Sequence, residues 1–111
     1  MTELIGTDNQ IEWAGRIRIQ VNDEFDRVAR VLSEAATRQS PPDRANTHLM
    51  IAILEEKRSE VLANPKAGYF IHDWQELRDQ VRQLIMKDDR YKAIKAGESN
   101  AAATIGGEPP Q

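Results

Sequence analysis

The sequence has no cysteine among its 111 residues, which excludes disulfide bonds, thiolate metal ligands and a cysteine nucleophile. It also lacks a long apolar run. The longest is LMIAIL, residues 49–54, whereas a membrane-spanning helix needs about 20 apolar residues. The opening segment, MTELIGTDNQ, contains neither the basic nor the apolar part of a secretory signal. We therefore expect a cytoplasmic protein with no membrane segment.

Residues that support catalysis are few and scattered. None of the glycines joins a strand to a helix in the pattern of a phosphate-binding loop. His48 and Glu55 are seven residues apart with no third ligand within sequence reach, which does not make a metal site. His72 precedes Asp73, but adjacent side chains rarely point to the same place. We predict a protein that is not an enzyme and uses no cofactor, metal or small-molecule substrate.

The first third of the sequence has the apolar spacing of a long amphipathic helix. Thr7 and Gln10 form a capping box at its start, with Thr7 as the N-cap residue. Several acidic residues precede an arginine by four positions, which places the two charges side by side on a helix. The pattern predicts a helix of roughly 30 residues, about 45 Å long. Its apolar face consists of Ile11, Ala14, Ile17, Val21, Phe25, Val28, Leu32 and Ala35.

Serine and proline mark the start of a second helix, expected over about residues 41–63. Ser40 suits the N-cap position, and Pro41 suits the first helical position. The centre of this helix, residues 49–54, is apolar nearly all round, so we expect it to be buried on more than one side. The Asn-Pro pair at 64–65 ends the helix, because a residue before proline avoids the α region.

Two further helices are expected after this break. The aromatic segment YFIHDW is expected to be a connection, and Asp73 with Glu76 forms a second capping box at the start of a third helix. A short fourth helix follows, begun by Asp88 or Asp89 and ended by Gly97. The apolar face of the third helix consists of Trp74, Leu77, Val81, Leu84 and Ile85.

These elements predict an all-α fold with one domain. Residues 1–6 lead into the domain, residues 7–96 form it, and residues 97–111, which lack apolar periodicity, form a disordered tail. The expected architecture is an antiparallel three-helix bundle with a long first helix and a short fourth helix. An up-down-up order brings a cluster to one end of the bundle, interpreted as a buried structural plug, with a ligand or partner hot spot as the alternative. Its residues are Trp13, Val61, Leu62, Phe70 and Trp74.

Charge is distributed unevenly along the chain. The formal net charge is −3, which argues against a general nucleic-acid-binding protein. Residues 78–96 nevertheless carry six basic and three acidic side chains. We interpret these cations as the polar face of two helices, with an acidic protein patch or nucleic-acid phosphates as the alternative partners. The candidate partner contacts are Arg78, Arg82, Lys87, Arg90, Tyr91, Lys92 and Lys95.

The segment GTDNQIEWAGRIR, residues 6–18, resembles the opening of a group of small, uncharacterised helical proteins of bacteria and phages. Those proteins share the form G-T-x-x-Q-I-x-W-A-x-x-I-R. The resemblance implies a small helical accessory protein of phage or mobile-element origin, and it brings no catalytic residues with it. The matching residues are Gly6, Thr7, Gln10, Ile11, Trp13, Ala14, Ile17 and Arg18.

The function predicted from the sequence is that of a non-enzymatic protein-interaction or regulatory module. We expect it to bind a protein partner or a second copy of itself, because the long apolar face of the first helix and the apolar centre of the second offer surface to cover. The alternative is an accessory nucleic-acid-binding protein that uses residues 78–96.

Overall fold

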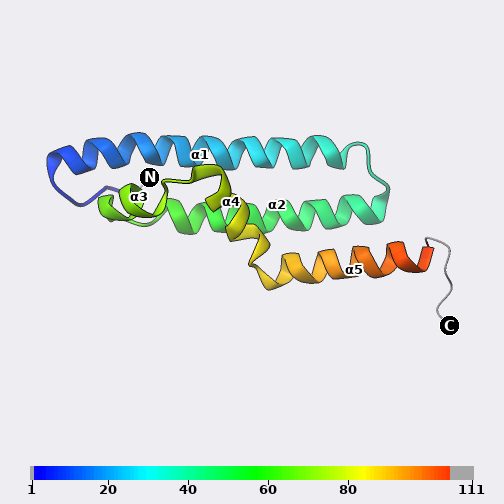
Figure 1. The fold of residues 1–111 in the computed structure, drawn as a ribbon. Coiled ribbons are helices and arrows are strands. Elements are labelled where there is room, and N and C mark those ends of the chain that lie inside the picture. The colour runs from blue at the N-terminus through cyan, green and yellow to red at the C-terminus, as the bar shows by residue number, and fades with distance from the viewer. Residues whose placement is uncertain (1, 106–111) are drawn as a thin grey trace.

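Five helices make up most of the chain that the structure describes. The computed structural model describes the backbone of residues 2–105 and the side chains of residues 2–98. The predicted all-α class is confirmed. Within the described range, no helix has both the length and the hydropathy needed to span a bilayer. The helices are α1 (Asp8–Ala36), α2 (Pro41–Leu62), α3 (Ala67–Asp73), α4 (Leu77–Met86) and α5 (Asp89–Ile105) (Figure 1).

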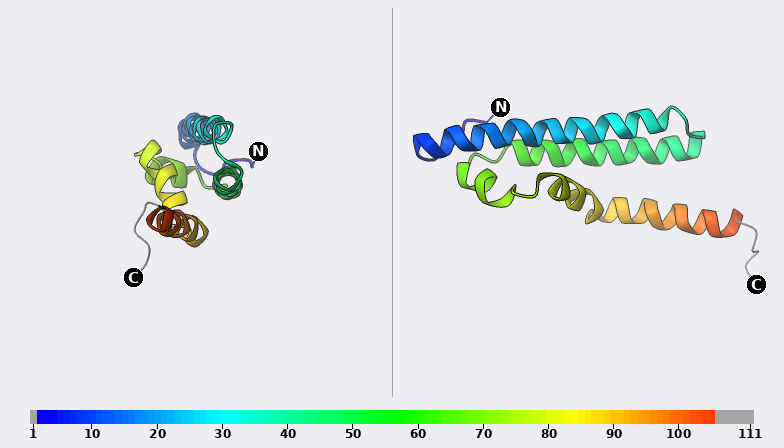
Figure 2. Two further views of the ribbon diagram at one scale, coloured as in Figure 1. Left: turned by 90° about the vertical axis from the view of Figure 1, so that its right-hand side faces the viewer. Right: turned by 45° about the horizontal axis from the view of Figure 1, so that its top comes forward.

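The two long helices α1 and α2 run antiparallel and side by side (Figure 1 and Figure 2). α1 begins with the predicted capping box, in which Thr7 Oγ1 accepts a hydrogen bond from the Gln10 N–H at 3.2 Å and Gln10 Oε1 accepts one from the Thr7 N–H at 3.0 Å. α2 begins with its proline pair, as predicted. The Arg44 guanidinium closes the turn of this hairpin by donating to the carbonyls of Ala36 and Gln39, each at 3.1 Å.

Phe25 lies at the centre of the core and is fully buried. Its ring is covered from α2 by Arg58, whose guanidinium carbon lies 5.8 Å from the ring centroid. The same guanidinium forms an ion pair with Asp26 Oδ1 on α1 at 2.6 Å. A cation over an aromatic face contributes about 0.5–2 kcal/mol when partly desolvated. Arg58 therefore fixes α2 against α1 at the level of the Phe25 ring.

The prediction that YFIHDW is a connection is wrong, because residues 69–73 belong to α3. The predicted third helix corresponds to α4 alone, and the predicted capping box at Asp73 is wrong. Asp73 is the last residue of α3, and α4 begins only at Leu77. Trp74, between them, has non-helical dihedral angles of φ −116° and ψ 35°. Its indole is buried and lies 6.3 Å from the Phe25 ring, between centroids. Burial of this side chain outweighs the local preference of aspartate for a helix start.

The predicted aromatic cluster forms only in part. Val61, Phe70 and Trp74 are buried, and Leu62 is half-buried. The expected burial of Trp13 is wrong, because its side chain is 56% exposed. The next residue of α1 points into the core, and consecutive helical residues diverge by about 100° around the axis, so Trp13 faces away from it.

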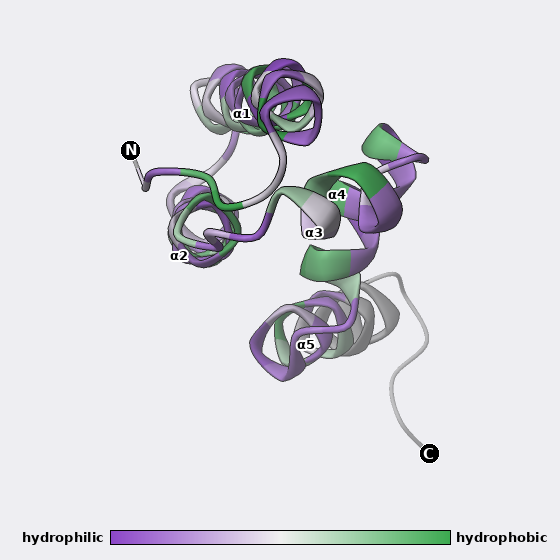
Figure 3. Cartoon of the chain, turned by 90° about the vertical axis from the view of Figure 1, so that its left-hand side faces the viewer, coloured by the Kyte–Doolittle hydropathy of each residue, from purple (hydrophilic) through white to green (hydrophobic). Residues whose placement is uncertain are grey.

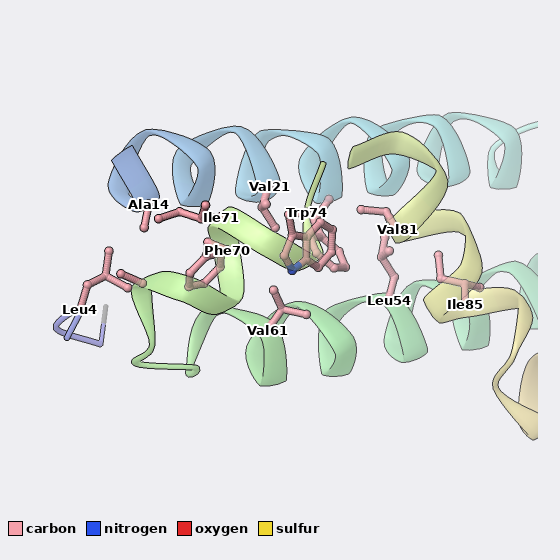
Figure 4. Close-up of a cluster of buried hydrophobic side chains, with 12 residues drawn as sticks. Leu4, Ala14, Val21, Leu54, Val61, Phe70, Ile71, Trp74, Val81 and Ile85 are labelled. Carbon is pink, nitrogen blue, oxygen red and sulfur yellow. The ribbon is translucent and has the colours of Figure 1, made fainter. Parts of the chain in front are cut away.

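A leucine from the N-terminal segment packs where the tryptophan was expected. Leu4 is buried at that end of the core (Figure 4). Backbone hydrogen bonds hold it there: the Ile5 N–H donates to the Pro65 carbonyl at 2.7 Å, and the Ala67 N–H donates to the Ile5 carbonyl at 3.0 Å. Part of the segment predicted as a lead, residues 1–6, therefore completes the core.

The last helix, α5, lies outside the group formed by the other four (Figure 3). Asp88 caps its start, as predicted, since Asp88 Oδ1 accepts from the Arg90 N–H at 2.8 Å. The helix was expected to end at Gly97 but continues to Ile105, through a segment rich in alanine, the strongest helix-forming residue. Of the predicted tail, residues 106–111 lie outside the described residues.

Replacing Gly15 by alanine is expected to raise the free energy of unfolding by about 0.5–1 kcal/mol, because alanine is the better helix former. A Cβ at this position meets no heavy atom within 4 Å. Gly6→Ala is the control: its Cβ would lie 3.0 Å from the Ala67 Cβ, so this variant is expected to be destabilised. Urea unfolding followed by circular dichroism measures both changes. A Gly15→Ala variant less stable than wild type would contradict the expectation.

Trp74→Ala is expected to lower the free energy of unfolding by about 3–5 kcal/mol, as large-to-small changes in a core do. Trp74→Phe is expected to cost less than half as much. Phenylalanine leaves a smaller cavity, and it removes an indole N–H that is buried without a hydrogen-bond partner among the described residues. Thermal unfolding of the two variants side by side tests this. Equal losses in the two variants would contradict the expectation, because a phenyl ring would then recover none of the stability that the indole provides.

Candidate functional site

A groove of about 620 Å³ lies between α1, α2, α4 and α5. Its volume falls in the range of binding pockets in proteins, about 300–1,000 Å³. The groove is open to solvent, and its floor is apolar. The floor residues come from three helices: Val28 and Leu32 of α1, Met50 of α2, and Val81, Ile85 and Met86 of α4.

The floor is open because the short helices cover only part of α1. The apolar face of α1 is fully buried at Ala14, Val21 and Phe25, where α3 and Trp74 lie against it. One and two turns further on, Val28 and Leu32 are only half-buried. α4 ends at Met86, and the chain then leaves the core as α5. The apolar surface of α1 that a longer α4 would cover therefore stays open to the groove.

Charged side chains form the rim of the groove. Four cations and two carboxylates line it, a net charge of +2 in a chain whose net charge is −3. Two of these cations have partners within the chain: Arg27 pairs with Glu24, and Lys95 pairs with Glu98. The cations are Arg27, Arg78, Arg82 and Lys95, and the carboxylates are Glu24 and Asp79.

Arg78 and Arg82 differ from the other rim cations in having no ion pair with any residue that the structure describes. Both guanidinium groups are on α4, both residues are exposed, and they are four positions apart. Residues at this spacing are neighbours on one face of a helix. The rim therefore presents two adjacent guanidinium groups beside an apolar floor.

Glu24 is the one buried acidic residue among those described, with 6% of its surface exposed. The Arg27 guanidinium donates to its carboxylate twice, from Nε at 2.8 Å and from Nη2 at 2.7 Å. These hydrogen bonds lower the pKa of Glu24 below its ordinary value, and the charges of Arg27 and Arg78 lower it further, while burial opposes the shift. Glu24 is therefore held ionised at the groove wall.

Ion pairs with α2 hold the first turn of α5 in place. Lys57 Nζ lies 3.2 Å from Asp88 Oδ2, and Arg90 Nη1 lies 2.9 Å from Glu56 Oε2. Arg90 also pairs with Asp88 at 2.9 Å, and the hydrogen bond between these side chains holds the pKa of Asp88 well below its ordinary value. This arrangement sets Tyr91, in the first turn of α5, against the groove.

The structure separates the basic residues that the sequence placed in one stretch. Four of the seven candidate contacts line the groove: Arg78, Arg82, Tyr91 and Lys95. The other three do not line it. Arg90 is turned toward α2 by its ion pairs, and Lys87 and Lys92 are exposed elsewhere.

Sequence reasoning missed the wall that α1 contributes. Glu24 was not singled out, and Val28 and Leu32 were expected only as part of the apolar face of the first helix. The sequence pattern contained the apolar positions, but nothing in it indicated that α4 would end before it covered them. Met50 is buried, as expected for the centre of the second helix, and it also lines the bottom of the groove.

The histidines considered for chemistry lie apart from the groove and are both exposed, His48 on α2 and His72 on α3. In the described part of the chain, no three His, Cys, Asp or Glu side chains lie close enough together to hold a metal ion. Comparison with known protein families, curated proteins and solved structures gives no match to this chain. The resemblance of residues 6–18 to small bacterial and phage proteins stays a prediction.

The Glu24–Arg27 pair predicts a specific dependence of stability on pH. Because the pKa of Glu24 is lowered in the folded state, its stabilising effect is present above the ordinary value of 4.5 and is lost as pH falls below it. Glu24→Gln removes this titration. The loss of unfolding free energy between about pH 6 and about pH 3 should be smaller in the variant than in wild type. Denaturant titrations across that range measure it, and an unchanged pH profile would refute it.

Proposed function

We propose that the chain is a non-enzymatic protein-interaction module and that it binds a partner protein through the groove. The proposal is carried by the combination of a solvent-open groove, whose apolar floor is partly exposed at Val28, Leu32 and Met86, with two arginines on its rim. Arg78 and Arg82 form no ion pair with any described residue. Removing apolar surface from water is favourable by about 25 cal/mol per Å², before the entropic cost of association is subtracted. Unpaired arginines beside it add the means to select a partner by charge.

The alternative, nucleic-acid binding through residues 78–96, is less well supported. A phosphate-binding surface needs cations arranged along a backbone path. Here Arg90 is engaged by Glu56 and Asp88, and two carboxylates, Glu24 and Asp79, line the groove beside its cations. Carboxylates at these positions would repel phosphates. An apolar floor also offers nothing to a phosphate backbone.

The test places a photo-crosslinking amino acid at Met86, an exposed residue of the groove. The control is the same amino acid at Leu49, which is exposed on α2 and does not line the groove. In cells of the source organism, we expect a discrete protein adduct from position 86 and none from position 49. The adduct should survive nuclease and disappear when Arg78 and Arg82 are both changed to glutamate.

The mass of the adduct distinguishes the possible partners. A crosslink to a second copy of the chain would identify self-association through the groove, and a different mass would identify another protein. Adducts that vanish with nuclease would favour the nucleic-acid alternative. Equal crosslinking from positions 86 and 49 would overturn the proposal, because contact would then be independent of the groove.

A further inference from the structure

We propose that the groove binds an amphipathic helix of a partner protein whose apolar stripe is flanked by aspartate or glutamate. The inference rests on the proposed function and specifies its partner. Three features of the groove support it: walls made of helices, a length that matches two helical turns, and a rim with an excess of positive charge.

The walls of the groove determine the backbone of the occupant. All four walls are helices, and helices hydrogen-bond their own backbone groups. The groove therefore offers side chains but no sheet edge, so an extended peptide bound here would find no strand to pair with. A helix satisfies its backbone internally and presents only side chains. A helix can therefore cover the apolar floor without leaving backbone N–H or C=O groups unpaired.

The length of the groove sets the spacing of the occupant's apolar residues. The α1 wall extends from Glu24 to Leu32, about 12 Å at 1.5 Å per residue. Two turns of a second helix have nearly this length. Apolar side chains at positions i, i+3 or i+4, and i+7 of that helix reach along the whole floor. Met50 and Met86, at the floor, are unbranched and adapt to different apolar shapes.

The charge of the rim sets the polar residues of the occupant. Arg78 and Arg82 are one helical turn apart on α4, so their guanidinium groups match carboxylates one turn apart on a facing helix. Arginine binds a carboxylate through two parallel hydrogen bonds, which gives orientation as well as attraction. A helix with lysine at the same positions would be repelled.

The probe is a designed helical peptide of about four turns, with leucine along one face and glutamate beside it at a spacing of four. The controls are a lysine version of the peptide and a scrambled sequence. Binding of the labelled peptides to the full chain is followed by fluorescence anisotropy. We expect the glutamate peptide to bind and the lysine and scrambled peptides to bind at least about tenfold more weakly.

Charge reversal tests whether Arg78 and Arg82 are responsible for the preference for the glutamate peptide. The double variant Arg78→Glu/Arg82→Glu should lose at least about tenfold in affinity for the glutamate peptide and should gain affinity for the lysine peptide. The matched control is Arg30→Glu/Arg38→Glu, which makes the same change of charge at exposed residues outside the groove. The control should change affinity by less than about twofold. Circular dichroism confirms that both variants remain helical.

Two outcomes would overturn this inference, and a third distinguishes it from the proposed function. Equal losses in the two double variants would overturn the inference, because attraction would then be a matter of net charge alone. A single-stranded oligonucleotide that binds tighter than the glutamate peptide, with the same dependence on Arg78 and Arg82, would also overturn it. If position 86 crosslinks to a protein but the glutamate peptide does not bind, the proposed function stands and the acidic helix is wrong.

Discussion

The packing of Trp74 on Phe25 is the contact on which the rest of the fold depends. The indole reaches the core only where the backbone leaves the helical conformation, and this divides the third segment into α3 and α4. α3 packs on α1, whereas α4 packs on both α1 and α2 and is too short to cover α1 as far as Leu32. The contact at the centre of the core therefore also leaves the groove open.

The starts of α1 and α2, which neighbouring residues determine, were predicted correctly from the sequence. The capping box at Thr7 and the prolines at the start of α2 act within one helical turn, and the structure has both. Features that depend on distant residues were not. Asp73 has the pattern of a helix start, but burial of Trp74 decides the conformation there. Trp13 has a size typical of core residues, yet the direction of its side chain on α1 leaves it exposed.

The candidate site was predictable only in its charges. Arg78 and Arg82 stood out because the basic residues are concentrated in one stretch of sequence. Their neighbours across the groove, Arg27 and Val28, are about 50 residues away in the sequence and belong to a helix with an unbroken amphipathic pattern. That pattern gives the direction of each side chain but not whether another helix covers it. Whether α1 is covered depends on where the chain breaks between α3 and α4, and packing of Trp74 decides that position.

The attachment of α5 has a consequence for the cooperativity of unfolding. Among the described residues, α5 packs on α2 and α4 alone, and the Arg90 side chain in its first turn is half exposed. Such ion pairs contribute about 0–1 kcal/mol each, far less than the buried contacts around Phe25. Local opening of α5 thus costs less free energy than global unfolding, and its amide protons exchange with solvent first. The wall that holds Tyr91 therefore opens at a lower free energy than the α1–α2 hairpin unfolds.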